Sequence, residues 1–302
     1  MTWSFIVHPE LPEFEVPSEA LRAAPPEVAR ASERLLPRAA REGRCRICGA
    51  EGPLTREHLP PQSAGNAGRG TEHTWDQWFT ASRDELPRQI PGGRVLQAGV
   101  WGATLCEACN NFVGGHYVPE YKGWTERASR VLHELPPPSE LDRRTSFTRA
   151  TVEFIDVDPG AFVRAALAEM CSVSVTWDIA GRHPELRRII LEGATEPLPE
   201  GLRLYLSLYW GPLTRICGPS LHVDRQTGAW EWIMEVAHPG LALLMVLTGT
   251  GQEPGLLDIG QWSVLPPGKR TDFEGDLDVG FGHVPYPGDY RTRAQIEADG
   301  LV

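Results

Sequence analysis

The chain has 302 residues, 41% of them hydrophobic, and a formal net charge of -11 at pH 7. This length suffices for one large domain or two smaller ones, each with its own buried core. The longest apolar run, residues 240–248, has the length of a strand, so we expect no membrane-spanning helix. The start of the chain has neither a basic leader nor a long apolar segment, which indicates no signal peptide and favours a cytoplasmic protein.

The acidic charge is unevenly distributed along the chain. Residues 41–134 contain eleven Lys or Arg and eleven Asp or Glu, so this segment is neutral and its flanks carry the whole excess. Proteins that bind nucleic acid usually present a basic surface. A neutral segment on an acidic body therefore predicts that any intrinsic binding to nucleic acid is weak and salt-sensitive, so a protein or guide-complex partner would have to deliver such a substrate.

In the first third of the chain, the positions of the prolines and the spacing of the apolar residues predict the following elements. Residues 1–16 are expected to be extended, and residues 27–41 to be mostly helical with a kink at Pro37. Residues 59–93 are rich in Gly, Pro and polar side chains and are interpreted as an inserted loop. A short strand is predicted over residues 95–105.

Two helices are expected next, and they are followed by a domain boundary. The first begins after residue 105 and ends near Gly115, and the second is amphipathic and spans residues 121–135. Three consecutive prolines come directly after the second helix and are interpreted as the boundary. We therefore predict two domains, residues 1–134 and residues 145–302.

The second domain is predicted to be α+β with a mainly antiparallel sheet. A helix is expected over residues 161–170, and a hairpin turn over residues 226–229. From residue 249 the sequence is rich in Gly and Pro and is interpreted as a tail, in which the acidic run 272–278 is solvated charge. Apolar, β-branched and aromatic runs predict strands at residues 202–210, 213–218, 220–223, 230–235 and 241–247.

Four of the six cysteines form two CxxC pairs, Cys45/Cys48 and Cys106/Cys109. Thiolates at the two ends of such a tight turn can both reach one metal ion, and a second pair completes a tetrahedral four-sulfur site. The spacing therefore predicts structural zinc rather than disulfides. The two remaining cysteines stand alone and are interpreted as buried small hydrophobic residues in a reducing compartment.

Between and beside the cysteine pairs lie residues that suit phosphodiester cleavage. His58 can act as a general base, because the pKa of histidine lies near neutral pH. The adjacent carboxylate of Glu57 and the amide oxygen of Asn110 can hold one magnesium-like ion, which prefers hard oxygen ligands. Asn110 follows the zinc ligand Cys109, so the metal would fix its position. Asn110 can also serve as a helix-capping residue, a role compatible with metal contact, and Asn111 is the alternative ligand.

Three motifs occur in a characteristic order: CxxCG over residues 45–49, acidic-His-x-x-Pro over residues 57–61, and LCxxCNxxxG over residues 105–114. Together they resemble the HNH, or ββα-metal, endonucleases, in particular the subgroup with four zinc-binding cysteines. Junction resolvases of the endonuclease VII type are similar. The resemblance covers residues 45–115, which is about a quarter of the chain.

The resemblance implies a ββα-metal module at the start of the chain, with structural zinc on the four cysteines. It also implies a catalytic Mg²⁺ or Mn²⁺ bound by Glu57 and Asn110, and His58 as the base that activates water. Glu57 stands where the common form of the family has Asp. The middle asparagine that often orients the histidine has no clear counterpart, since Asn66 comes early in the chain, so we expect a backbone carbonyl to hold His58.

The expected function is therefore metal-dependent hydrolysis of phosphodiester bonds in DNA, with the C-terminal domain in a recognition or regulatory role. Invading DNA, as for a phage-defence or restriction effector, is the hypothesis for the target. Two alternatives stay open. One is a non-catalytic, zinc-stapled module that binds nucleic acid or protein, which the missing middle asparagine favours. The other is a nuclease directed at RNA.

Overall fold

The computed structural model describes residues 18–23, 42–72, 93–135, 147–174, 177–210, 214–223, 229–249 and 256–280. These residues form a mixture of helices and mostly antiparallel sheets, as the sequence predicts. The earliest element is a short helix, α1 (Ser18–Ala23). The segments predicted over residues 1–16 and 27–41, and most of the turn predicted at residues 226–229, lie outside the described residues.

A small antiparallel sheet and two helices are the main elements in the described part of the first half. The sheet has the strand order β1-β2-β5, and its last strand leads directly into a helix. Both helices predicted from the sequence are present, each with ends close to those expected. The elements are β1 (Glu42–Arg44), β2 (Glu51–His58), β5 (Trp101–Cys106), α3 (Glu107–His116) and α4 (Val118–Glu134).

The connection between β2 and β5 is more ordered than the inserted loop predicted there. It contains the 3-10 helix η2 (Gln62–Ala64) and a small antiparallel pair, β3 (Gly70–Glu72) and β4 (Arg94–Leu96). The single strand predicted over residues 95–105 was wrong, because β4 and β5 are separate. Gly99 lies between them with a φ of +75°, a left-handed conformation that interrupts a strand.

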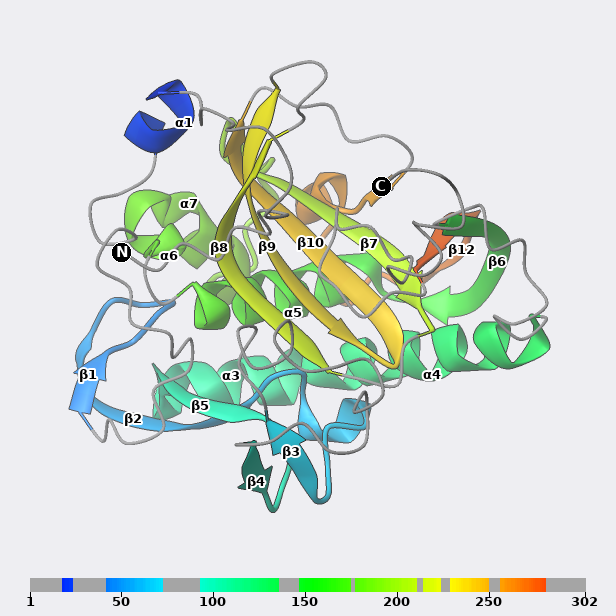
Figure 1. Cartoon of the computed structure of the whole chain (residues 1–302), viewed down its shortest axis with the longest axis horizontal. Helices are drawn as coiled ribbons and strands as arrows, with labels where there is room; N and C mark the ends of the chain where they lie inside the picture. The colour runs from blue at the N-terminus through cyan, green and yellow to red at the C-terminus, as the bar shows by residue number, and fades with distance from the viewer. Residues whose placement is uncertain are drawn as a thin grey trace, which may run out of the picture.

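A seven-stranded sheet dominates the second half, with the order β6-β12-β7-β10-β9-β8 and β11 paired to β7 (Figure 1). All neighbours are antiparallel except β12 and β7, so the prediction of a mainly antiparallel sheet is confirmed. The strands are β6 (Phe147–Val157), β7 (Arg203–Tyr209), β8 (Arg215–Val223), β9 (Trp230–His238), β10 (Gly240–Gly249), β11 (Leu257–Asp258) and β12 (Thr271–Gly280).

Two details of this sheet differ from the sequence prediction. The strands expected at residues 213–218 and 220–223 are one strand, β8, with a register shift between Cys217 and Ser220. The predicted tail contains β12, where the acidic run 272–278 pairs with β6. Three of its acidic side chains are exposed, as expected for solvated charge, and they alternate with inward-facing residues. The sequence prediction missed this strand because every second residue is charged, and the apolar residues typical of a strand lie only on its inward face.

Helices α4 and α5 (Pro159–Val173) pack against the large sheet, α4 on β6 and β10 and α5 on β8 and β9 (Figure 1). Every residue of α5 is buried. Two shorter helices, α6 (Ile179–Arg182) and α7 (Pro184–Leu191), and the 3-10 helix η4 (Gly260–Val264) complete the described elements. One buried core includes residues from both sides of the predicted domain boundary, and the division into two domains stays a prediction.

Candidate metal centre and the residues beside it

The first cysteine pair lies in the turn of the β1–β2 hairpin. The backbone N–H of Cys45 donates to Ala50 O at 2.9 Å, and the N–H of Gly49 donates to Cys45 O at 2.9 Å. Gly49 has a φ of +75°, which glycine adopts without steric cost. The glycine after CxxC therefore closes the tight turn that brings Cys45 and Cys48 together.

The second pair spans the junction between β5 and α3. Cys106 is the last residue of β5 and the N-cap of α3, and Cys109 lies in the first turn of the helix. The N–H of Arg46 donates to Thr104 O at 3.0 Å, which fastens the first turn to β5. A helix N-terminus carries partial positive charge that stabilises thiolates, so this end of α3 favours a metal-binding pair.

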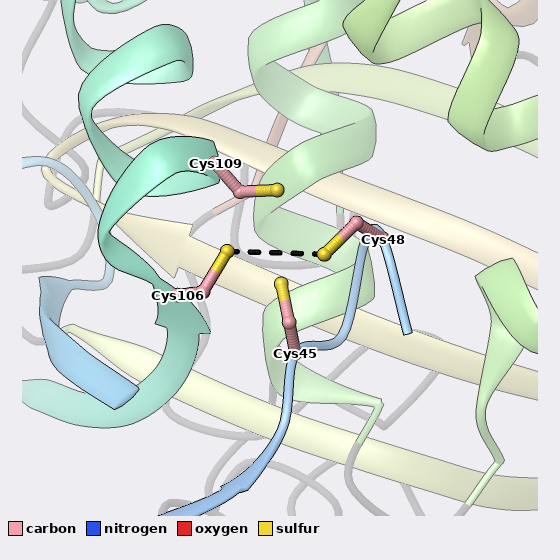
Figure 2. Close-up of side chains that lie close together, drawn as sticks. All are labelled: Cys45, Cys48, Cys106 and Cys109. Carbon is pink, nitrogen blue, oxygen red and sulfur yellow. Dashed lines mark hydrogen bonds between the residues drawn. The ribbon is translucent and has the colours of Figure 1, made fainter. Parts of the chain in front are cut away.

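The four sulfur atoms point toward one another (Figure 2), and all lie within 4.8 Å of each other. The Sγ atoms of Cys48 and Cys106 are 3.8 Å apart. A zinc ion with Zn–S bonds of about 2.3 Å in a tetrahedron places its sulfur ligands about 3.8 Å apart. The prediction that the two pairs form one cluster is confirmed, and this cluster can bind a metal such as zinc.

The thiol pKa values within the cluster are also compatible with a metal-binding site. A hydrogen bond from Cys109 lowers the pKa of the Cys45 thiol to about 4. The same contact, together with burial, raises the pKa of Cys109, and burial raises that of Cys48. Without a cation these shifts favour a thiolate at Cys45 and protonated thiols at Cys48 and Cys109. Binding of a divalent metal would release these protons.

Asn110 faces β2 from the first half of α3. Its Nδ2 donates to Thr55 Oγ1 at 3.0 Å and to Arg56 O at 2.9 Å, where the β2–β5 register shifts. Thr55 Oγ1 in turn donates to Leu105 O at 3.0 Å. Asn110 Oδ1 has no hydrogen bond within the described part of the chain. The amide nitrogen therefore orients the side chain and leaves its oxygen available as a ligand.

Glu57, near the end of β2, is held by two hydroxyl groups. Its Oε2 accepts hydrogen bonds from Thr104 Oγ1 at 2.8 Å and from Ser172 Oγ at 2.7 Å. Burial raises the pKa of the carboxyl to about 7, and the two hydrogen bonds oppose this shift. The other oxygen, Oε1, makes no hydrogen bond to any residue that the structure describes.

His58 is half-buried at the end of β2, and its Nε2 lies 2.9 Å from Ala98 O. A carbonyl can only accept, so we infer that Nε2 carries the proton and that Nδ1 keeps its lone pair. Burial lowers the pKa of His58, which favours the neutral ring at pH 7. The expectation that a backbone carbonyl holds His58 is confirmed.

The sequence reasoning set Asn66 aside, yet it closes the loop beside His58. Its Nδ2 donates to Pro60 O and to Val100 O, and its Oδ1 accepts from Val100 N, each at 2.7 Å. It is only 7% exposed. These bonds tie the segment that follows His58 to the segment just after Ala98, so Asn66 shapes the carbonyl contact of the histidine. The sequence feature that could have singled out Asn66 is its position directly after a turn.

The structure thus brings the four cysteines together and places Glu57, His58 and Asn110 in the same β2–β5–α3 unit. Comparisons with protein families, curated proteins and solved structures found no match to this chain. Within the described ranges, the four cysteines are the one group of His, Cys, Asp or Glu side chains close enough to hold a metal. No helix among these residues is long and apolar enough to cross a membrane.

Proposed function

We propose that the chain is a metal-dependent endonuclease of the HNH type that hydrolyses phosphodiester bonds, with DNA favoured over RNA as the substrate. In this proposal the four-cysteine cluster is a zinc-bound scaffold and not the reaction centre. The observation that carries the proposal is the orientation of His58: its Nε2 faces Ala98 O, which leaves Nδ1 as a basic atom in the same β2–β5–α3 unit that contains Glu57 and Asn110.

His58 is suited to general-base catalysis. The lowered pKa keeps the ring neutral at pH 7, so Nδ1 can take a proton from an attacking water. When the ring becomes positively charged, the Ala98 carbonyl stabilises it through the Nε2 hydrogen bond. The structure therefore gives His58 both an acceptor atom and a partner for its charged form.

Glu57 and Asn110 fit a hard divalent cation such as Mg²⁺ or Mn²⁺. Each has one polar atom committed to neighbouring groups and one oxygen without a hydrogen bond among the described residues, and oxygen is the ligand these ions prefer. When bound, such a cation supplies electrostatic stabilisation of the charge on the departing oxygen. Asn110 is anchored at the helix start next to Cys109, which links its placement to the sulfur cluster.

An arginine supports a phosphate-containing substrate at this site. Arg56 is exposed, and its guanidinium lies 4.2 Å above the ring of Trp101. Arg56 and His58 are two residues apart in β2, so both side chains project from the same face. A planar cation next to the proposed base suits contact with a phosphate oxygen. The acidic flanks of the chain favour a partner that delivers the nucleic acid.

A nicking assay tests the proposal. Supercoiled plasmid and labelled RNA are incubated side by side with the native chain, with His58→Ala and with His116→Ala, in Mg²⁺, in Mn²⁺ and in chelator. His116 is a matched control, because it is an exposed histidine of α3 whose ring bonds its own helix at Phe112 O. We expect metal-dependent cleavage of DNA by the native chain and His116→Ala, and a loss of about 100-fold or more in His58→Ala.

Equal cleavage by the native chain and His58→Ala would contradict the proposal, as would an absence of cleavage by the native chain on either substrate. In the second case the sulfur cluster would belong to a non-catalytic binding module. Faster cleavage of RNA than of DNA would retain the nuclease and change its substrate.

A further inference from the structure

The helix α5 joins the large sheet to the proposed nuclease site. It contacts β8 and β9 of the sheet and also β5 and α3 (Figure 1). Ser172 lies in its last turn and is fully buried. Its hydroxyl donates to Glu57 Oε2 at 2.7 Å. One hydrogen bond from a buried hydroxyl therefore connects the second half of the chain directly to a residue that the proposal assigns to cation binding.

A second buried hydroxyl acts on the same carboxylate oxygen. Thr104, also fully buried, donates to Glu57 Oε2 at 2.8 Å from the neighbouring strand. Two donors on one oxygen hold the carboxylate in a single orientation and leave Oε1 without a partner in the described residues. A ligand that is oriented before the cation arrives loses less conformational freedom on binding, so its affinity is higher.

The environment of Ser172 offers its hydroxyl another acceptor. Glu169 lies three residues earlier on the same helix, a spacing at which side chains are neighbours. It is 3% exposed, and its carboxyl group makes no hydrogen bond to Ser172. Ser172 nevertheless donates to Glu57 on a different element. The hydroxyl thus serves the contact between the two halves of the chain rather than a contact within its own helix.

We propose that Ser172, together with Thr104, is a positioning residue that orients Glu57 for the divalent cation. The second half of the chain would then set the metal affinity of the nuclease site through α5. This inference rests on the proposed function, because it assigns Glu57 to cation binding.

The test measures Mn²⁺ binding to the full-length, zinc-loaded chain by electron paramagnetic resonance, with Glu57→Gln identifying the specific site among weaker acidic sites. Ser172→Ala is expected to weaken Mn²⁺ affinity about 10-fold and to raise the Mg²⁺ concentration needed for cleavage, with little change in rate at saturating metal. Ser174→Ala is the matched control, since Ser174 is equally buried but its hydroxyl bonds Cys171 O at 2.8 Å. Affinity in this control should equal that of the native chain.

Variants at Thr104 apply the same test if Ser172→Ala does not fold. Thr104→Val removes the hydroxyl at nearly constant shape and should lower Mn²⁺ affinity, while Thr104→Ser keeps the hydroxyl and should restore it. Unchanged Mn²⁺ affinity in Ser172→Ala, or in Thr104→Val, would overturn the inference and leave the proposed function standing. Absence of any Mn²⁺ site sensitive to Glu57→Gln would overturn the proposed cation site, and the inference with it.

Discussion

The side-chain amide of Asn66 forms two hydrogen bonds with the backbone of Val100, as the backbone of a neighbouring strand would. Asn66 Oδ1 accepts from Val100 N, and Asn66 Nδ2 donates to Val100 O, both at 2.7 Å. Gly99 permits this approach, because a Cβ atom there would lie 2.2 Å from Asn66 O. The pairing closes the loop in which Ala98 O contacts His58, so a residue outside the predicted site controls the geometry of that site.

Asn66→Ala is expected to lower the free energy of unfolding by about 2–3 kcal/mol, because the N–H of Val100 and the carbonyl of Pro60 both lose their hydrogen-bond partner. If the chain is a nuclease, cleavage should also fall about 10-fold or more at a temperature where the variant is folded. Urea unfolding and the nicking assay measure the two effects. Gln62→Ala is the control, since Gln62 is exposed in the same connection between β2 and β5. Equal stability of the two variants would show that the Asn66 bonds contribute little.

The sulfur cluster should bind one zinc ion per chain. Cys109→Ser is expected to lose that zinc and to unfold at a markedly lower temperature, because a structural zinc site contributes directly to folding. Metal analysis of the purified protein and thermal unfolding provide the measurements. Cys217→Ala is the control, since this cysteine is free and lies in β8, outside the cluster. Equal zinc content in Cys109→Ser and the native chain would rule out the four-sulfur site.

Arg164 is fully buried in α5, and its guanidinium donates to backbone carbonyls around it, among them Ile189 O at 2.9 Å and Ala194 O at 2.7 Å. We expect Arg164→Met to lower the free energy of unfolding by about 3 kcal/mol or more, because several buried carbonyls lose their donor. Arg188→Ala on α7 removes an exposed ion pair with Glu196 and should lower the free energy of unfolding far less, because solvent screens an exposed pair. Chemical denaturation of both variants checks the contrast, and similar losses would contradict it.

His238 predicts a loss of stability in acid. It is 2% exposed, its Nε2 lies 3.0 Å from Tyr121 OH, and burial lowers its pKa to about 4. In the unfolded chain the pKa is about 6.5, so the unfolded state binds the proton first as the pH falls. The contribution of neutral His238 to the free energy of unfolding is therefore complete above pH 6.5. It is lost as the pH falls to about 4, by up to about 3 kcal/mol.

Urea unfolding from about pH 7.5 to about pH 4.5 measures this loss, and His238→Gln isolates it. The glutamine variant lacks a group that titrates in this range, so its stability should fall less steeply with decreasing pH than that of the native chain. Parallel pH profiles for the two proteins would show that His238 is not responsible.

Local sequence patterns predicted the elements whose physical cause lies within a few residues. CxxCG specifies a tight turn because both thiols and the positive-φ glycine lie within five consecutive residues, and the structure has that turn at Cys45 to Gly49. The helix after the second pair and the apolar strands β7, β9 and β10 followed from composition and period for the same reason. The catalytic roles of Glu57, His58 and Asn110 stay predictions.

What the sequence by itself determined was therefore the pairing of cysteines within each turn, the mixed α and β character and the positions of the strongest helices and strands. Only the tertiary structure decided that Asn66 clamps Val100, that Ser172 reaches Glu57 across 115 positions of the chain, and that β12 pairs with β6. Such contacts join segments far apart in sequence, and no local propensity or spacing encodes which distant backbone or side chain will satisfy a buried polar group.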